Sequence, residues 1–372
     1  MIKQNSFLLF AIKIISKLYF LSATVCSKSV KFSKLFMNAI IREFSIHSKN
    51  FYYKYEIYNK KNDVLGCNES IDNIAIILQG PVCYDNDFTI NTVLRYKKLY
   101  PQIQVIISTW DDEKEEFFKR CDQLDICYIK NHFPENIEKI NTHYQLYSTK
   151  KAIESLDDKQ INYVLKTRTD QRIYSECFLE NLMTLIKTYP KLGNLDVKER
   201  LIFLNADASS YKYYAYHISD MFVFGNIKDM KSFYSIPMKS LKIVDNYDVV
   251  HGFDKKVNKL REIEHLTTLG IEDVYNIIDN YDDFINYKAT VVSELYIIHS
   301  FIEILKGKKI VNNHLSEYWN FLAGYCCIID KEILELYWPK YIFEYWSGLN
   351  SQKYGCLSHF NWLEIHNSIG NI

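Results

Sequence analysis

Short apolar runs separated by polar turns predict the strands of an α/β sheet. Residues 74–78 (IAIIL) form a continuous run rich in β-branched side chains, which is too short for a helix and typical of a strand covered on both faces. A similar run covers residues 104–107. Between the two runs, Ile90, Val93 and Leu94 recur at helical spacing. This stretch is therefore expected to form a βαβ unit.

The same alternation of elements continues along the chain. Further strands are predicted at residues 126–129, 163–170, 201–204 and 222–224, and helices at residues 112–122, 139–156, 271–285 and 291–305. Residues 240–270 lose periodicity and gain charge, which predicts a loop, and loops of this length tend to be functional or disordered. The chain is therefore expected to be α/β with a helical C-terminal region.

The N-terminal segment differs from the rest of the chain. Its first 42 residues contain seven lysine and arginine residues and no acidic residue, interleaved with apolar runs. Lys13 and Lys17 interrupt those runs, so no apolar span of roughly 18 to 20 residues is available to cross a bilayer. The pattern favours an amphipathic helix lying on anionic lipid. A helix docked on the catalytic domain and an uncleaved signal anchor are the alternatives.

Charge and cysteine content narrow the possible functions. Lysine plus arginine equals aspartate plus glutamate, at 45 each, which argues against a dedicated nucleic-acid binder. The nine cysteines are odd in number and contain no C-x-x-C pair, which suits a reducing compartment and gives no zinc-site spacing. The chain also lacks P-loop, dinucleotide-binding, nucleophile-elbow and zincin motifs. These absences exclude several common enzyme classes.

Polar side chains cluster where predicted strands end. Lys166, Arg168 and Asp170 follow an apolar strand, and ligands of open α/β sheets bind outside the carboxyl ends of strands. Because side chains alternate along a strand, Lys166 and Arg168 are expected on one face, shared by Asp170 if the strand continues. One cation would then reach a diphosphate while the other orients the carboxylate. The alternative is a surface ion pair between Arg168 and Asp170, which would be worth little.

Five motifs in order resemble one family. They are residues 78–81 (LQGP), 108–110 (STW), 141–145 (NTHYQ), 166–170 (KTRTD) and 218–225 (ISDMFVFG), with a weaker match at 293–296 (SELY). The chain resembles the WavE-type lipopolysaccharide synthesis proteins, which are similar to bacterial glycosyltransferases with a GT-A-like fold. The resemblance implies a Rossmann-like mixed sheet flanked by helices. It also implies a nucleotide-sugar-binding core at 71–236, after a basic apolar segment at 1–50 and before a loop and helical region at 237–372.

The resemblance also implies which residues bind the donor. The nucleotide-sugar-binding candidates are Gln79, Gly80, Pro81, Ser108, Thr109, Asn141, Gln145, Lys166, Arg168 and Asp170. Asp170 is the candidate contact for a divalent cation, Mg²⁺ or Mn²⁺, because such hard ions take carboxylate and phosphate oxygens. GT-A enzymes usually present Asp-x-Asp, whereas this chain has Arg168-Thr169-Asp170. That departure leaves metal dependence open.

Two carboxylates are candidates for acid–base chemistry on the acceptor. Asp220 could act as general base if the reaction inverts the anomeric centre, or could contact a metal or ribose, or cap a turn. Glu294 is the rival base, with helix capping as its structural alternative. His217 lies close to Ser219 and Asp220 in the sequence, and its side chain is expected to pack in the core rather than to take part in the reaction.

Together these features predict a nucleotide-sugar-dependent glycosyltransferase. Its expected acceptor is a lipopolysaccharide core, a lipid-linked glycan or another cell-surface glycan, and its expected location is the cytoplasm, peripheral at the inner membrane. The alternative is a non-catalytic GT-A-like protein that binds a sugar nucleotide or scaffolds polysaccharide assembly. A nucleotidyltransferase is disfavoured because residues 79–83 (QGPVC) contain no cation for a phosphate loop.

Overall fold

The computed structural model describes residues 71, 73–134, 141–205, 212–238, 269–338 and 357–370. The chain divides into two compact units, Met1–Gly66 and Cys67–Ile372, and every described residue belongs to the second. The N-terminal segment with its three alternatives and most of the predicted loop at 240–270 therefore lie outside the described residues. Within the described residues, no helix is long and apolar enough to cross a membrane.

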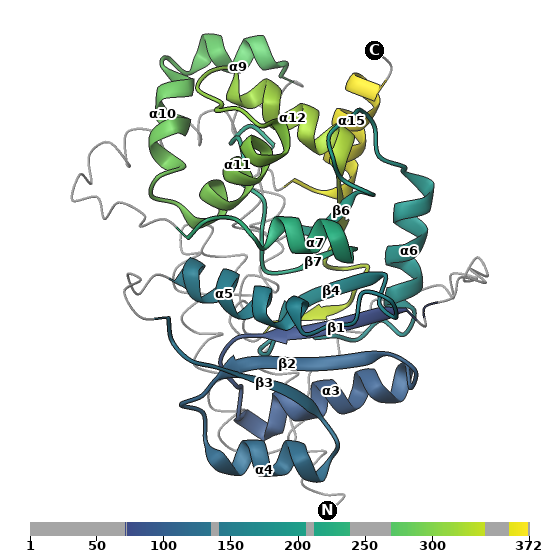
Figure 1. Ribbon diagram of the computed structural model, residues 1–372. Helices are drawn as coiled ribbons and strands as arrows, with labels where there is room; N and C mark the ends of the chain where they lie inside the picture. Colours follow the sequence, from purple (N-terminus) through teal and green to yellow (C-terminus); the bar gives the residue numbers. More distant parts are fainter. Residues whose placement is uncertain are drawn as a thin grey trace, which may run out of the picture. The chain divides into compact units, whose positions relative to one another are not determined.

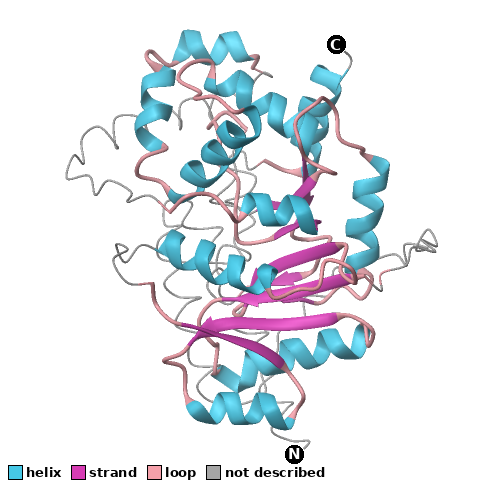
Figure 2. Ribbon diagram, in the orientation of Figure 1, coloured by secondary structure: helices cyan, strands magenta, loops and turns pink. Residues whose placement is uncertain are grey.

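A seven-stranded mixed sheet forms the centre of this unit (Figures 1 and 2). In spatial order its strands are β3 (Cys127–Asn131), β2 (Gln104–Trp110), β1 (Ile74–Gln79), β4 (Tyr163–Arg168), β7 (Val223–Asn226), β6 (Leu201–Asn205) and β8 (Cys326–Asp330). β7 runs antiparallel to both of its neighbours, and the other pairs are parallel. All six residues of β1 are buried, as its continuous apolar run predicts.

Helices flank the sheet and dominate the C-terminal part of the chain. They are α3 (Phe88–Leu99), α4 (Glu115–Gln123), α5 (Asn141–Glu154), α6 (Phe178–Thr188), α7 (Ile227–Phe233), α9 (Ile271–Ile277), α10 (Tyr281–Lys288), α11 (Ser293–Lys306), α12 (His314–Tyr325) and α15 (His359–Gly370). α5 packs on β1 to β3 and contacts α7, which packs on β4 and β7. Figure 1 shows α9 to α12 gathered together beyond β6 and β7. The predicted α/β class with flanking helices and a helical C-terminal region is confirmed.

Two details differ from the sequence prediction. The helix predicted at 271–285 is two helices, because Asn280 adopts a left-handed conformation with φ of 56° and separates α9 from α10. The C-terminal region also supplies a sheet strand, β8, which pairs in parallel with β6. β8 begins at the residue after the end of α12, so the sequence has no turn signal between them, and the strand was not predicted.

A small second sheet pairs a strand of the C-terminal region with a strand that follows β4. β5 (Arg172–Ile173) pairs antiparallel with β9 (Leu336–Tyr337). Arg172 is buried and donates from Nε to Thr92 Oγ1 at 2.8 Å and from Nη2 to the Phe88 carbonyl at 2.8 Å. This ribbon is thereby fixed to α3, and the residue after β9, Trp338, reaches the turn that follows β4.

Candidate active site

The strand order reverses between β1 and β4. The chain passes from β1 outward to β2 and β3, then returns to β4 on the other side of β1. Such a switch point opens a crevice at the carboxyl ends of the two strands, where open α/β sheets bind their ligands. β1 and β4 are in register with Gln79 opposite Arg168, so both strands end at the same level. Residues 79–81 and 168–170 therefore meet at this edge.

Hydrogen bonds join these two strand ends. Thr169 donates from its backbone N–H to the Gln79 carbonyl at 3.2 Å and from Oγ1 to the Pro81 carbonyl at 2.5 Å. Gly80 has φ of 124°, a conformation that side chains disfavour, and a Cβ there would lie 3.2 Å from Thr169 Oγ1. Glycine is thus required at position 80 for both the turn and the close approach to β4.

Arg168 and Asp170 form a two-point ion pair at this edge of the sheet. Arg168 donates from Nε to Asp170 Oδ1 at 2.7 Å and from Nη2 to Oδ2 at 3.1 Å. Trp338 donates from Nε1 to the same Oδ2 at 3.1 Å, and the Arg168 guanidinium lies 5.6 Å from the centre of the Trp338 ring. Burial raises the pKa of Asp170, but hydrogen bonding and charge from Arg168, with help from Trp338, outweigh it and lower the pKa.

A second cluster lies on the α5 side of β4. Lys166 is fully buried and donates from Nζ to the Asp220 carbonyl at 2.9 Å, with Met221 O at 3.4 Å. Gln145 of α5 donates from Nε2 to Asp220 Oδ2 at 2.7 Å. Arg168 Nη1 also contacts this segment, at 3.6 Å from Met221 Sδ. The prediction that Lys166 and Arg168 share a face is confirmed by their common contacts.

Burial shifts the proton affinities of this cluster. Desolvation lowers the pKa of Lys166 to about 7, although the charge of Asp220 opposes the shift. Desolvation also raises the pKa of Asp220, whose Oδ1 is buried without a hydrogen-bond partner in the described part of the chain. An amine that ionises near neutrality beside a buried carboxylate is typical of functional sites.

Glu294 belongs to the same electrostatic group. Burial, followed by the charge of Asp220, raises the pKa of Glu294 to about 7. It lies in the first turn of α11, where the N-cap position makes no side-chain hydrogen bond. The two carboxylates singled out in the sequence, 74 positions apart, therefore influence each other through their charges, and Glu294 is less buried than Asp220.

Three further predicted donor-binding residues have side chains held inside the protein. Gln79 is 4% exposed and donates from Nε2 to Ser148 Oγ at 3.0 Å. Ser108 is fully buried and donates to the Ser148 carbonyl at 2.8 Å, and Thr109 donates to Glu113 Oε1 at 3.1 Å. These contacts fasten α5 and the loop after β2 to the sheet. A donor-binding role for these three side chains stays a prediction.

Other candidates can also be located. Asn141 begins α5, but its side chain lies outside the described residues. Trp110 is 4% exposed and stacks on Phe133 at 4.4 Å, so it packs rather than offering a face to a base. His217 lies against the Tyr214 ring at 4.9 Å, which agrees with the predicted packing role.

The surroundings of Asp170 do not fit a metal site. Both carboxylate oxygens already accept hydrogen bonds, and the neighbours that supply them are the cation Arg168 and the N–H donor Trp338. Among the residues that the structure describes, no group of three histidine, cysteine, aspartate or glutamate side chains could hold a metal ion. The metal role of Asp170 stays a prediction without support from its neighbours.

Two residues of this region were missed in the sequence. The sequence around Trp338 indicates only an aromatic side chain that packs, because nothing in the local pattern connects it with Asp170. Tyr234 is 1% exposed, its hydroxyl lacks a hydrogen-bond partner within the described residues, and burial and the charge of Asp220 raise its pKa. It lies between Phe233 and Ser235, and nothing in this local pattern distinguishes it from a core tyrosine.

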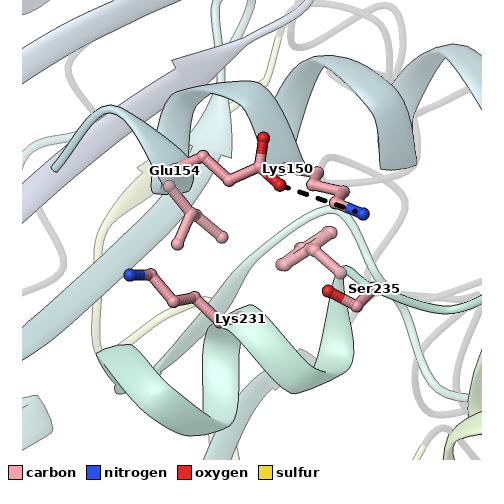
Figure 3. A pocket seen from close by; sticks show the side chains of 6 residues that line it. Lys150, Glu154, Lys231 and Ser235 are labelled. Carbon is pink, nitrogen blue, oxygen red and sulfur yellow. Dashed lines mark ion pairs between the residues drawn. The ribbon is translucent and has the colours of Figure 1, made fainter.

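A hollow of about 180 Å³ lies between α5 and the end of α7, and Tyr234 is one of the residues that line it. Figure 3 shows Lys150 and Glu154 on one side and Lys231 and Ser235 on the other. Lys150 pairs with Glu154 at 3.8 Å, and Lys231 pairs with Asp158 at 2.5 Å. No residue predicted for the site lines this hollow, and its cations are already paired, so it is not the candidate active site.

Comparison with protein families identifies this chain. The family model described as WavE lipopolysaccharide synthesis matches residues 74–266, which is more than half of the 372 residues. The chain belongs to the WavE lipopolysaccharide synthesis family. Within this WavE protein the match covers β1 to α7 and so includes Lys166, Arg168, Asp170 and Asp220, whereas Glu294 and Trp338 lie beyond it. The GT-A-like fold class inferred from the sequence agrees with its mixed seven-stranded sheet.

Comparison with single proteins adds little to this assignment. No curated protein matches the WavE chain. Among solved structures, S. aureus TarS 1-349 is 10% identical and covers 63% of this chain and 81% of that chain, with a TM-score of 0.32. A glycosyltransferase involved in glycosylation of the major capsid of PBCV-1 is 11% identical and covers 49% and 76%, with a TM-score of 0.27. A 4-diphosphocytidyl-2C-methyl-D-erythritolsynthase from Anaerococcus prevotii is 14% identical and covers 49% and 84%, with a TM-score of 0.29. At such TM-scores no function is carried over.

Proposed function

We propose that this WavE family member is a glycosyltransferase that moves a sugar from a nucleotide-sugar donor to a lipopolysaccharide or other cell-surface glycan acceptor. The family description supports a role in lipopolysaccharide synthesis. The observation that carries the proposal is the meeting of cations and carboxylates at the switch point between β1 and β4. Arg168 and Lys166 supply positive charge there, Asp220 supplies a carboxylate, and the pKa of Glu294 responds to the charge of Asp220.

These groups meet the needs of sugar transfer. The transition state carries positive charge on the anomeric carbon and negative charge on the departing phosphate oxygen. In a displacement that inverts the anomeric centre, the acceptor oxygen forms a bond to that carbon while the carbon–phosphate-oxygen bond breaks. The nucleotide leaves with the electron pair, and the acceptor proton passes to a carboxylate. Arg168 and Lys166 would stabilise the leaving group, and no step is derived through a metal.

Of the two carboxylates, Glu294 has the proton affinity and exposure that suit a proton acceptor better. Its pKa of about 7 matches a general base that works near neutral pH. Asp220 is 2% exposed and is held by Gln145, so we assign it to positioning and to raising the pKa of Glu294.

The acceptor and its location belong to the same proposal. A lipid-linked or lipopolysaccharide-core acceptor is expected at the cytoplasmic face of the inner membrane. The basic, apolar residues 1–40 would give the protein a peripheral membrane contact close to such a substrate. Deleting these residues should shift the protein from membrane to soluble fractions, and unchanged partitioning would argue against the contact.

Donor binding is tested by thermal stability. A ligand that binds only the native state raises its free energy of unfolding, by about 2.7 kcal/mol at 100 times its Kd. The purified full chain is heated with UDP-, GDP-, CMP- and dTDP-sugars, alongside Lys166→Met and the exposed control Lys119→Met. We expect one nucleotide class to raise Tm in the wild type and the control, with a smaller rise in Lys166→Met. If none does, the non-catalytic scaffold becomes the better account.

A further inference from the structure

We infer that Arg168, held in place by Asp170 and Trp338, binds the diphosphate of the donor directly, and that Asp170 orients this arginine instead of ligating a metal. The inference rests on the proposed function for the presence of a nucleotide-sugar donor. It assigns a positioning role to Trp338, a residue outside the part of the chain that the family model matches. The ligand chemistry it names is a pyrophosphate linkage.

The arginine retains an open edge for an anion. A guanidinium carries five N–H donors, and the pair with Asp170 uses one on Nε and one on Nη2. The Nη1 group contacts the thioether sulfur of Met221 at 3.6 Å, which is a weak acceptor. Within the described residues Nη1 and Nη2 make no other hydrogen bond, and two parallel N–H groups on the edge between them would match two phosphate oxygens.

The side chains of Arg168 and Asp170 are partly exposed to solvent, whereas Trp338, which contacts both, is buried. The Arg168 side chain is 19% exposed and that of Asp170 is 25% exposed, while Trp338 is 5% exposed. Two hydrogen bonds and the indole ring fix the guanidinium plane before a ligand arrives. A preorganised donor loses less conformational freedom on binding than a free surface arginine.

The donors around Asp170 favour this role over metal binding. Its oxygens accept from Nε and Nη2 of Arg168 and from the indole N–H of Trp338. A divalent cation at this carboxylate would bind beside the positive charge of Arg168 and would compete with its two hydrogen bonds. Lys166 lies two positions earlier on the same strand face and adds positive charge to this region while it is protonated.

The short β5–β9 ribbon positions Trp338, which directly follows β9. Arg172 and Tyr337 are paired in this ribbon, and the Tyr337 ring lies 5.8 Å from Phe88 of α3. The indole is therefore positioned by the main scaffold, 168 positions away from Asp170 in sequence. Loss of the indole N–H alone should change the orientation of the Arg168–Asp170 pair without unfolding the chain.

The test measures binding of inorganic pyrophosphate to the full chain by calorimetry, in EDTA and again with Mn²⁺. Arg168→Lys keeps the positive charge but loses the paired N–H donors of the guanidinium, and Trp338→Phe keeps an aromatic ring but loses the indole N–H. Arg120→Lys alters the exposed Arg120–Asp87 pair, and Trp319→Phe removes an indole bond to the Lys212 carbonyl, so both serve as matched controls. Turnover of nucleotide sugars is followed in the same preparations.

We expect wild-type binding in EDTA that weakens roughly 10- to 100-fold in Arg168→Lys and about 3- to 10-fold in Trp338→Phe, with both controls unchanged. Binding that requires Mn²⁺, binding insensitive to Arg168→Lys, or no binding at all would overturn the inference. Turnover then separates the two proposals. Donor turnover with the wrong binding pattern refutes only the inference, and the expected binding without any turnover refutes the proposed function.

Discussion

Gln145 donates from Nε2 to both Oδ2 and the backbone carbonyl of Asp220, at 2.7 and 3.2 Å, across 75 positions of sequence. The bond joins α5 to the segment before β7 and fixes one oxygen of a carboxylate that is almost completely buried. The other oxygen, Oδ1, has no hydrogen-bond partner within the described residues. Asp220 is thus placed to act on its neighbours through its charge, and Glu294 is the neighbour whose pKa responds.

The pH dependence of transfer should report this coupling. Glu294 must lose its proton to act as base, so this group makes the rate rise with pH around a midpoint near 7, while Lys166 loses its charge over the same range and lowers the rate at higher pH. Asp220→Asn removes the negative charge that helps to raise this pKa, so the midpoint should move to lower pH. The exposed Asp112→Asn is the control. Rates measured from pH 5 to 9 check this, and a midpoint unmoved by Asp220→Asn would contradict the coupling.

Glu294→Gln should remove the base while preserving its size. General-base catalysis contributes about 10²- to 10⁴-fold, so kcat should fall by that order while the donor KM changes little. Glu272 lies in the first turn of α9, as Glu294 does in α11, and is exposed. Glu272→Gln should therefore retain full activity. Full activity in Glu294→Gln instead would return the base assignment to Asp220.

Lys166→Met should change how stability depends on pH. In the folded chain the pKa of Lys166 is about 7, against an ordinary value of 10.5. Between these values the unfolded state binds more protons, so this residue makes the free energy of unfolding rise with pH from about 7 to 10.5. Urea unfolding at pH 7, 8 and 9 should show a smaller rise in Lys166→Met than in the wild type or the exposed Lys119→Met. Identical slopes would show that Lys166 is not perturbed.

Gly80→Ala should cost more than an alanine at another positive-φ glycine. The backbone strain costs of order 1–3 kcal/mol, and the new Cβ would press on Thr169 Oγ1 at 3.2 Å. Gly307 has φ of 62°, and a Cβ added there would have no neighbouring atom within 4 Å, so Gly307→Ala should pay strain alone. Chemical unfolding compares the two. Donor affinity should fall only in Gly80→Ala, and equal effects in both variants would leave position 80 without a special role.

Much of the fold follows from local pattern. Strands covered on both faces must be continuously apolar, which made β1 and the buried part of β2 visible in the sequence. Side-chain alternation along β4 also predicted that Lys166 and Arg168 share a face. The break at Asn280 was missed because the apolar spacing continues through it. Asparagine tolerates the left-handed conformation, so that residue was the available signal.

The site was only partly predictable for a different reason. A polar side chain at a strand end can face a ligand or a covering helix, and alternation does not distinguish these, as Gln79 and Ser108 show by bonding to Ser148. The contact between Trp338 and Asp170 depends on a ribbon with two residues in each strand, which is too short to leave a periodic signal. Long-range pairings of this kind are set by the whole packed chain.

Acceptor-stimulated release of nucleotide from nucleotide sugars is the measurement that tests the central claim most directly. The purified full chain is incubated with UDP-, GDP-, CMP- and dTDP-sugars, with and without extracted lipopolysaccharide core, alongside Glu294→Gln and Glu272→Gln. The glycosyltransferase account predicts release from one nucleotide class, faster with acceptor, retained in Glu272→Gln and reduced about 10²-fold or more in Glu294→Gln. Donors that all remain intact with folded wild-type protein and acceptor would contradict it.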